Sequence, residues 1–118
     1  MQPIAIESPM NKTESAFAQY CELLKRAGEI FDYRFEPMKF MLAGNIEGKH
    51  NAVTYLPDFL IVYSDHFELA ETKAKNKDWT SMKDDARCKI NIAAELFPWF
   101  RWTIYYLERG RWTKELVN

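Results

Sequence analysis

Apolar residues recur at three- and four-residue steps in two parts of the chain, which predicts two helices. The first is predicted over residues 12–27, with Asn11 as its N-cap and Gly28 directly after its end. The second is predicted over residues 81–97 and ends at Pro98. Their apolar stripes contain Phe17, Tyr20, Cys21, Leu24 and Ala27 in the first helix, and Met82, Ala86, Ile90, Ala93 and Phe97 in the second.

Runs rich in aromatic and β-branched residues predict the strands. Pro37 interrupts the first run, and a Gly- and Asn-containing loop over residues 43–52 separates it from the second. The runs cover residues 29–42, 55–63, 67–73 and 99–107.

The second and third runs are so close that a two-residue turn, Ser64-Asp65, is the simplest connection between them. In that register residue 58 pairs with residue 71. Because side chains alternate along a strand, the side chains of one face can be named. They are Leu56, Asp58, Leu60 and Val62 from one strand and Phe67, Leu69, Glu71 and Lys73 from the other.

The predicted element order is α-β-β-β-α-β, and a helix between two strands indicates a crossover connection. We therefore expect an α/β (α+β) fold with a mixed central sheet flanked by helices. The length of 118 residues fits one domain. Residues 1–10 are expected to form a loose leader and residues 111–118 a tail.

The face of the hairpin is apolar except for two acids and one lysine at one end. Opposed carboxylates about 5 Å apart repel by about 3 kcal/mol at an effective dielectric near 20. A divalent cation reverses the sign of that interaction, and Mg²⁺ prefers oxygen ligands. Lys73 would then lie near a reacting water or a phosphoryl oxygen. The alternative is a buried ion-pair cluster of Asp58, Glu71 and Lys73 without chemistry.

Pro57-Asp58 followed by Glu71-Thr72-Lys73 resembles the signature of the PD-(D/E)xK nuclease superfamily. Glu14, on the first predicted helix, matches an acidic residue of its resolvase-like branch. The chain is similar to a small phage-encoded family of that branch over roughly residues 11–107, and it departs from the pattern in having Ala74 where Gly often follows the lysine. The other shared elements are Phe35-Glu36-Pro37, Tyr55 to Phe59, and a basic helix that ends in Phe97-Pro98.

The resemblance implies a restriction-endonuclease-like αβββαβ core and a Mg²⁺-dependent endodeoxyribonuclease, with Mn²⁺ as a second possible cofactor. It implies that Asp58, Glu71 and Glu14 bind the metal together with the backbone carbonyl of Thr72, and that Lys73 orients or activates the attacking water. It further implies branched recombination or replication DNA as substrate, as for Holliday-junction resolvases, a homodimer, and a phage-encoded protein in the cytoplasm of a bacterial host cell.

The net charge of −1 and the pI of about 6.1 lack the overall basic excess of a non-specific nucleic-acid binder. The basic residues are clustered, however, and a basic surface beside an acidic metal site suits a polyanion. Simple solvation of these side chains is the alternative. The residues expected to contact DNA are Lys49, Lys75, Lys77, Lys83, Arg87 and Lys89.

Two cysteines without zinc-ligand spacing are expected to be buried free thiols. No apolar run approaches the length of a membrane span. Trp99 and Trp102 are expected in the core or an interface, whereas Trp79 and Trp112 are expected to be exposed, for base stacking or a dimer contact. Two other functions stay open: a catalytically silent DNA-binding or recombination accessory protein, and a protein whose aromatic surface binds a host enzyme.

Overall fold

A computed structural model describes residues 9–44, 48, 51–75 and 85–118. It confirms the mixed α+β class, with a central sheet and flanking helices. No helix among the described residues has the length and apolarity needed to cross a membrane. The elements are α1 (Lys12–Arg26), β1 (Asp32–Phe35), β2 (Phe40–Ala43), β3 (Val53–Tyr55), β4 (Phe59–Val62), β5 (Phe67–Ala74), α2 (Asp85–Leu96), β6 (Arg101–Glu108) and β7 (Arg111–Leu116).

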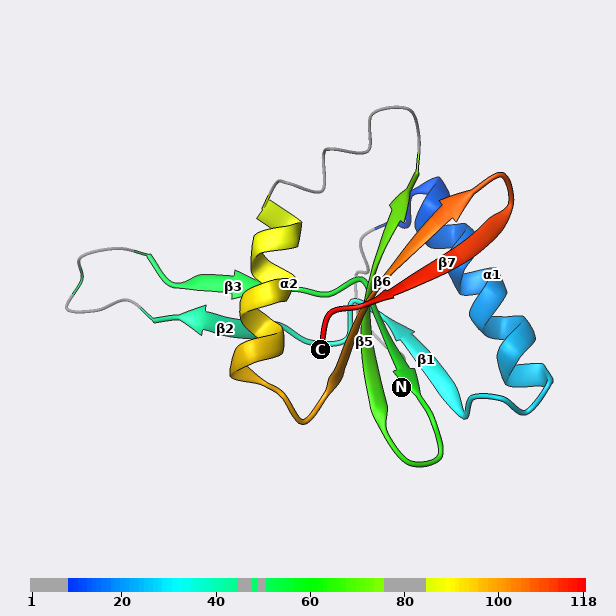
Figure 1. Cartoon of the computed structure of the whole chain (residues 1–118), viewed down its shortest axis with the longest axis horizontal. Helices are drawn as coiled ribbons and strands as arrows, with labels where there is room; N and C mark the ends of the chain where they lie inside the picture. Colours follow the sequence, from blue (N-terminus) through cyan, green and yellow to red (C-terminus); the bar gives the residue numbers. More distant parts are fainter. Residues whose placement is uncertain (1–8, 45–47, 49–50, 76–84) are drawn as a thin grey trace, which may run out of the picture.

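The central sheet has five strands in the order β1-β4-β5-β6-β7 (Figure 1). Only β5 and β6 run parallel, and α2 supplies the crossover that parallel neighbours need. In the central sheet the elements follow the expected α-β-β-β-α-β order from α1 to β6. Strands β2 and β3 form a separate two-stranded ribbon that extends away from the sheet (Figure 1).

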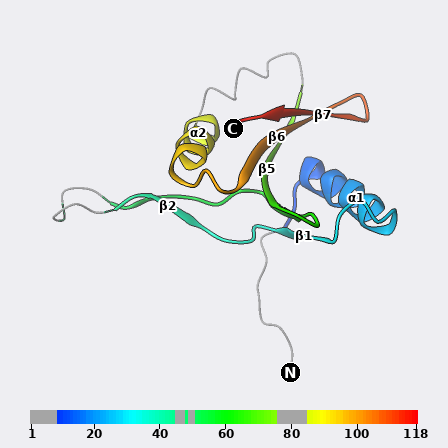
Figure 2. The ribbon, with the colours of Figure 1, turned by 60° about the horizontal axis from the view of Figure 1, so that its bottom comes forward.

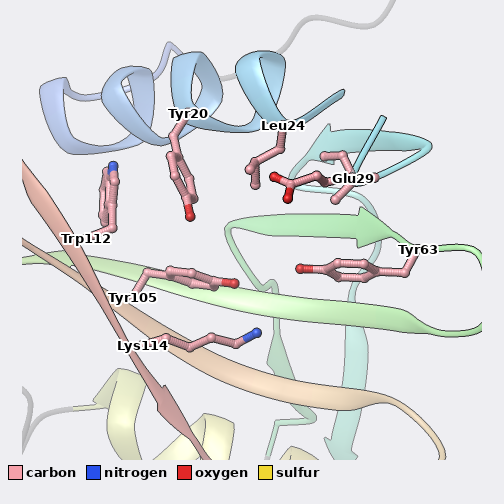
Figure 3. Close-up of a pocket in the computed structure, with 8 residues that line it drawn as sticks. Tyr20, Leu24, Glu29, Tyr63, Tyr105, Trp112 and Lys114 are labelled. Carbon is pink, nitrogen blue, oxygen red and sulfur yellow. The ribbon is translucent and has the colours of Figure 1, made fainter. Parts of the chain in front are cut away.

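The two helices cover opposite faces of the central sheet (Figures 1 and 2). On the α2 face, Ile90 and Ala93 pack against Leu69 and Trp102. On the α1 face, the core contains Phe17, Cys21, Phe59, Ile61, Ala70 and Tyr105. Figure 3 shows further α1 side chains facing this side of the sheet. The alternation of side chains along β5 and β6 thus gives each helix its own apolar surface.

Helix α1 begins and ends where the sequence predicts. Asn11 is the N-cap, and its side chain accepts a hydrogen bond from the backbone N–H of Glu14 at 2.7 Å. The carboxylate of Glu14 accepts one from the backbone N–H of Asn11 at 2.9 Å, which completes a capping box. Gly28 follows the helix with φ of +80°, a conformation that favours glycine.

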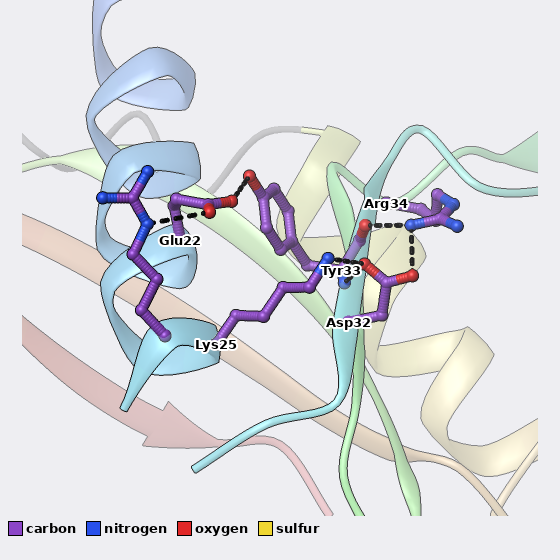
Figure 4. A network of polar contacts seen from close by, with 6 residues as sticks. Glu22, Lys25, Asp32, Tyr33 and Arg34 are labelled. Carbon is purple, nitrogen blue, oxygen red and sulfur yellow. Dashed lines mark hydrogen bonds and ion pairs between the residues drawn. The ribbon is translucent and has the colours of Figure 1, made fainter. Parts of the chain in front are cut away.

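Polar contacts at its C-terminal end tie α1 to β1 (Figure 4). The hydroxyl of Tyr33 donates to Glu22 at 2.8 Å, and Lys25 donates to Asp32 at 3.2 Å. Asp32 also pairs with Arg34 at 2.6 Å. Such exposed pairs add little stability, so they mainly fix the direction in which the chain enters the sheet.

The hairpin register is confirmed, but the strand assignment around Pro57 is wrong. Phe59 pairs with Ala70 and Val62 with Phe67, which is the register that places residue 58 opposite residue 71. The predicted strand 55–63 is divided, however, because β3 ends before the buried Pro57 and β4 begins after Asp58. Proline has no N–H to donate to a ladder, so the chain leaves one sheet there and enters the other.

The first extended run is divided in the same way. Glu36 has a φ of +46°, and together with Pro37 it separates β1 in the central sheet from β2 in the ribbon. The second half of the predicted strand 29–42 therefore belongs to a different sheet.

The predicted tail over residues 111–118 is wrong, because Arg111–Leu116 forms the edge strand β7. Arg109 and Gly110 have φ of +52° and +75°, as a two-residue hairpin turn requires. Strand β7 pairs with β6 from Glu108 opposite Arg111 onward.

Three further expectations about single side chains need correction. Both cysteines are free, but only Cys21 is buried, whereas Cys88 is exposed on α2. Trp102 is fully buried, as expected for the core, whereas Trp99 is 71% exposed and so is not a core residue; its place in an interface stays a prediction. Trp112 is partly buried against Phe17, and Trp79 lies outside the described residues.

We expect Gly110→Ala to lower the free energy of unfolding by about 1 kcal/mol, because an L-residue at positive φ is strained. Gly44→Ala is the matched control, since Gly44 lacks a positive φ and an added Cβ meets only Met41 Sδ at 3.9 Å. Urea unfolding of the two variants makes the comparison. Equal stability of the Gly110 variant and the unmodified chain would contradict the β6–β7 turn.

Candidate metal centre

The residues of the expected site converge at one end of the central sheet. Asp58 lies directly before β4, whereas Glu71 and Lys73 lie in the second half of β5. Glu14 lies in the first turn of α1. The charge of Glu14 raises the pKa of both Asp58 and Glu71, and that of Lys73 lowers both. Residues far apart in the sequence therefore act on one another here.

Thr72 holds the carboxylate of Asp58. Asp58 Oδ2 accepts hydrogen bonds from the backbone N–H of Thr72 at 2.9 Å and from its hydroxyl at 3.0 Å. Burial raises the pKa of Asp58 to about 6, and the charge of Glu14 adds to this, whereas the bonds from Thr72 oppose it. The hydrogen bonds thus fix the orientation of the carboxylate, whereas burial still disfavours its ionised form.

Glu71 is more deeply buried, with 7% of its surface exposed. Its Oε1 accepts a hydrogen bond of 2.6 Å from the hydroxyl of Tyr55. Burial and then the charge of Asp58 raise the pKa of Glu71 to about 8, against the hydrogen bond from Tyr55. Burial and the same carboxylate also raise the pKa of Tyr55, so Tyr55 stays a donor.

Neither acid has a cationic partner in contact among the described residues. The ion pairs between those residues include none to Asp58 or Glu71, and Lys73 acts on both only over a longer distance. A simple buried ion-pair cluster of these three residues therefore does not describe the site. The pair of acids is left with unneutralised charge whenever both are ionised.

The two carboxylates suit a hard divalent cation that takes only a few of its ligands from the protein. Within residues 9–44, 48, 51–75 and 85–118, no three His, Cys, Asp or Glu side chains form a group able to hold a metal ion. The carboxylate of Glu14 is engaged in the capping box, so the structure does not bring it in as a third ligand. Mg²⁺ commonly uses only one or two carboxylates, with waters and substrate phosphates completing its shell. Asp58 and Glu71 fit that pattern.

Two of the lysines that are expected to contact DNA lie close to acidic side chains. Lys75 lies 3.9 Å from Glu108, and Lys89 lies 3.5 Å from Asp85. Lys49, Lys77 and Lys83 lie outside the described residues.

Arg87, which is also expected to contact DNA, forms an ion pair within the protein. Its guanidinium makes two hydrogen bonds to the carboxylate of Glu115, of 2.8 and 2.9 Å, and a third to Tyr106. This bidentate pair joins α2 to β7, a strand that lies where the sequence predicts a tail.

Two supports of the site were missed by sequence reasoning. The hydroxyl of Tyr55 reaches Glu71, and the hydroxyl of Thr72 reaches Asp58. Tyr55 precedes the Pro-Asp pair by two residues, but its contact is with a residue 16 positions away. Only the fold of the β3–β4 segment onto β5 reveals it.

No known protein family matches this chain, and no curated protein matches it either. Among solved structures, a crystal structure of SSO0001 is similar over 88% of this chain, with a TM-score of 0.56 and 17% sequence identity. The chain spans 48% of the length of that protein. At this identity the similarity shows a shared fold and nothing about activity.

The two acids make the stability of the metal-free protein depend on pH. Their pKa values in the folded chain, about 6 and about 8, lie above the ordinary values of 3.8 and 4.5. Their contribution to stability is therefore fully present below about pH 4 and is lost as the pH rises through 6 and 8. The carboxyls with lowered pKa act in the opposite sense, but only at lower pH: Glu22, Asp32, Asp65 and Glu115.

We expect the free energy of unfolding, measured by urea titration in EDTA, to be lower at pH 9 than at pH 5 by on the order of 3 kcal/mol. Glu71→Gln should remove most of that difference, because the amide cannot ionise. Glu95→Gln, at an exposed position of α2, is the matched control and should keep it. Stability that stays constant or increases over this range would contradict the assignment.

Proposed function

We propose that this protein is a Mg²⁺-dependent endodeoxyribonuclease that hydrolyses phosphodiester bonds. The observation that carries the proposal is the pair of acids, Asp58 and Glu71, which are oriented by hydrogen bonds and have no cationic partner in contact among the described residues. The arrangement lies on a sheet of αβββαβ order and within a sequence that resembles the PD-(D/E)xK signature. Mn²⁺ would fit the same oxygen ligands.

Asp58 and Glu71 would hold the cation, and the backbone carbonyl of Thr72 is a further ligand implied by the resemblance. When bound, Mg²⁺ supplies Lewis acidity that polarises a phosphoryl oxygen and lowers the pKa of water. Thr72 and Tyr55 keep the two carboxylates in place, so that little reorganisation accompanies binding.

Lys73 has a different task in this proposal. It follows Glu71 by two residues on β5 and therefore lies on the same face of the strand. An ammonium at that position orients the attacking water and stabilises the negative charge that develops on the phosphate. Burial is the main cause of the raised pKa of both acids, and the charge of Glu14 adds to it.

Protons compete with the cation for these carboxylates. Asp58 and Glu71, with pKa values of about 6 and about 8, must lose their protons before they act as ligands. The affinity for Mg²⁺ therefore increases with pH across this interval, and the cation then removes the repulsion between the two acids.

The resemblance extends the proposal to the substrate, which would be branched recombination or replication DNA. The enzyme would be a phage-encoded homodimer that acts in the cytoplasm of a bacterial host. Two strands must be cut at a junction, which favours two sites. Lys75 and Lys89 on the described surface, with Lys49, Lys77 and Lys83, would contact the phosphates.

One observation favours a second candidate function, a catalytically silent DNA-binding accessory protein on the same fold. Glu14, which the resemblance implies as a ligand, is engaged in the capping box. If this chain has the accessory function, it should bind branched DNA equally well with and without Mg²⁺.

We expect Mg²⁺ to support cleavage of branched DNA by the unmodified chain, and Asp58→Asn or Glu71→Gln to abolish it because each removes a charged ligand. Lys73→Met should reduce the cleavage rate on the order of 100-fold while Mg²⁺ binding is kept. Gel assays of cleavage and calorimetry of Mg²⁺ binding measure the two properties separately.

The matched controls are Glu95→Gln for the acids and Lys25→Met for the lysine, because both side chains are exposed outside the site. Branched-DNA binding without cleavage, in a chain that also fails to bind Mg²⁺, would support the accessory protein and contradict the nuclease. Cleavage by Asp58→Asn at the unmodified rate would remove Asp58 from the mechanism.

A further inference from the structure

A cavity of about 380 Å³ lies between α1 and the face of the sheet that α1 covers (Figure 3). Tyr63 lines it near the end of β4 that lies away from Asp58, whereas Tyr105 lines it from β6, beside Thr72. None of its lining residues takes part in the proposed chemistry. The cavity is thus a second site that the proposed chemistry does not use. Its lining residues include Tyr20, Leu24, Tyr63, Tyr105, Trp112 and Lys114.

The aromatic walls of the cavity are held by their neighbours. Trp112 lies edge-on to Phe17 with ring centroids 5.1 Å apart and contacts Tyr20 at 6.2 Å. Tyr63 stacks on His66 at 4.4 Å with an interplanar angle of 10°. Walls that are fixed before binding lose little conformational freedom when a ligand enters.

Tyr105 and Lys114 form the polar floor of the cavity, and both are hydrogen-bonded to Glu68, which lies buried behind them. Glu68 is completely buried and accepts hydrogen bonds of 2.7 Å from the hydroxyls of Thr103 and Tyr105. Its other oxygen accepts a bond of 3.1 Å from Lys114 Nζ. An ammonium has three N–H groups, so Lys114 keeps donors for a ligand.

Figure 3 shows the hydroxyls of Tyr20 and Tyr63 and the ammonium of Lys114 directed toward the cavity. The Tyr63 hydroxyl also hydrogen-bonds with Glu68 and Tyr105, so it offers a ligand its acceptor lone pair rather than its proton. The carboxylate of Glu29 lies at its exposed side. The cavity therefore offers aromatic faces together with both donors and acceptors.

The charges select a neutral ligand. The pairing of Lys114 with Glu68 cancels both charges at the floor. An anion would enter against the carboxylate of Glu29, and neither an organic cation nor an anion finds an unpaired opposite charge in the Lys114–Glu68 pair. A flat, uncharged ring that carries its own donors and acceptors satisfies the walls and the floor together, and nucleobases have this chemistry.

We propose that this cavity binds one unpaired nucleobase. The ring contacts the aromatic wall while Tyr20, Tyr63 and Lys114 hydrogen-bond to its edge. The base comes either from a free nucleoside or from a DNA strand on the protein. The strand source rests on the proposed function, since bases of branched DNA are accessible where pairing is interrupted.

Titration of tryptophan fluorescence with thymidine and adenosine, in EDTA, tests the proposal. We expect saturable quenching, because Trp112 lines the cavity. Tyr20→Phe and Tyr63→Phe should each weaken binding about fivefold through loss of one hydrogen bond. Tyr33→Phe is the matched control, since its hydroxyl bonds to Glu22 outside the cavity, and its affinity should be unchanged.

Nucleoside affinity that is the same in Tyr20→Phe/Tyr63→Phe as in the unmodified chain would overturn the proposal, as would tighter binding of choline or inorganic phosphate than of nucleosides. Two duplexes, one with an unpaired thymidine and one with an abasic site in its place, distinguish the sources. Tighter binding of the first assigns the base to a strand, and equal binding with retained nucleoside affinity assigns it to a free nucleoside.

The same titrations with Asp58→Asn keep the two proposals separate. Quenching that persists in this variant while cleavage is lost supports both. Cleavage without any quenching by nucleosides overturns the cavity proposal alone, and quenching in a chain that never cleaves DNA leaves the cavity proposal standing without the nuclease.

Discussion

The two-residue turn between β4 and β5 sets both the packing of the central sheet and the position of the acidic pair. It fixes the register in which Phe59 faces Ala70, and that register brings Asp58 beside Glu71 at the far end of the hairpin. Side chains alternate, so a slip by one residue would move these acids to opposite faces and exchange the surfaces that α1 and α2 cover. Two apolar cores therefore hold in place a pair of charges that would otherwise separate.

Much of the fold follows from local chemistry that is visible in the sequence. The helix boundaries near Asn11 and Gly28 depend on capping, which acts within a few residues. The β2–β3 ribbon and β7 could not be predicted in the same way. Their assignment depends on backbone conformations at Glu36 and Arg109, two non-glycine residues at positive φ that carry little sequence signal.

The acids of the site were predictable because their identity and the hairpin register suffice to bring them together. Their supports were not, since Tyr55 approaches Glu71 only after the chain has turned at Pro57. The balance of burial against hydrogen bonding, which raises the pKa of both acids, is a property of the packed site and has no counterpart in the motif. Glu14 could not be assigned from the sequence for the same reason. It matches both the acidic position of the nuclease pattern and the acidic position of a capping box, and only the structure shows that it caps the helix.

The most direct measurement is an NMR titration of the carboxyl carbons of Asp58 and Glu71, with and without saturating Mg²⁺. We expect pKa values of about 6 for Asp58 and about 8 for Glu71 in the metal-free protein. With Mg²⁺ both values should fall, because the cation stabilises the ionised forms. Ordinary carboxyl pKa values in the metal-free protein, or raised values that Mg²⁺ does not change, would contradict a metal centre built on these two acids.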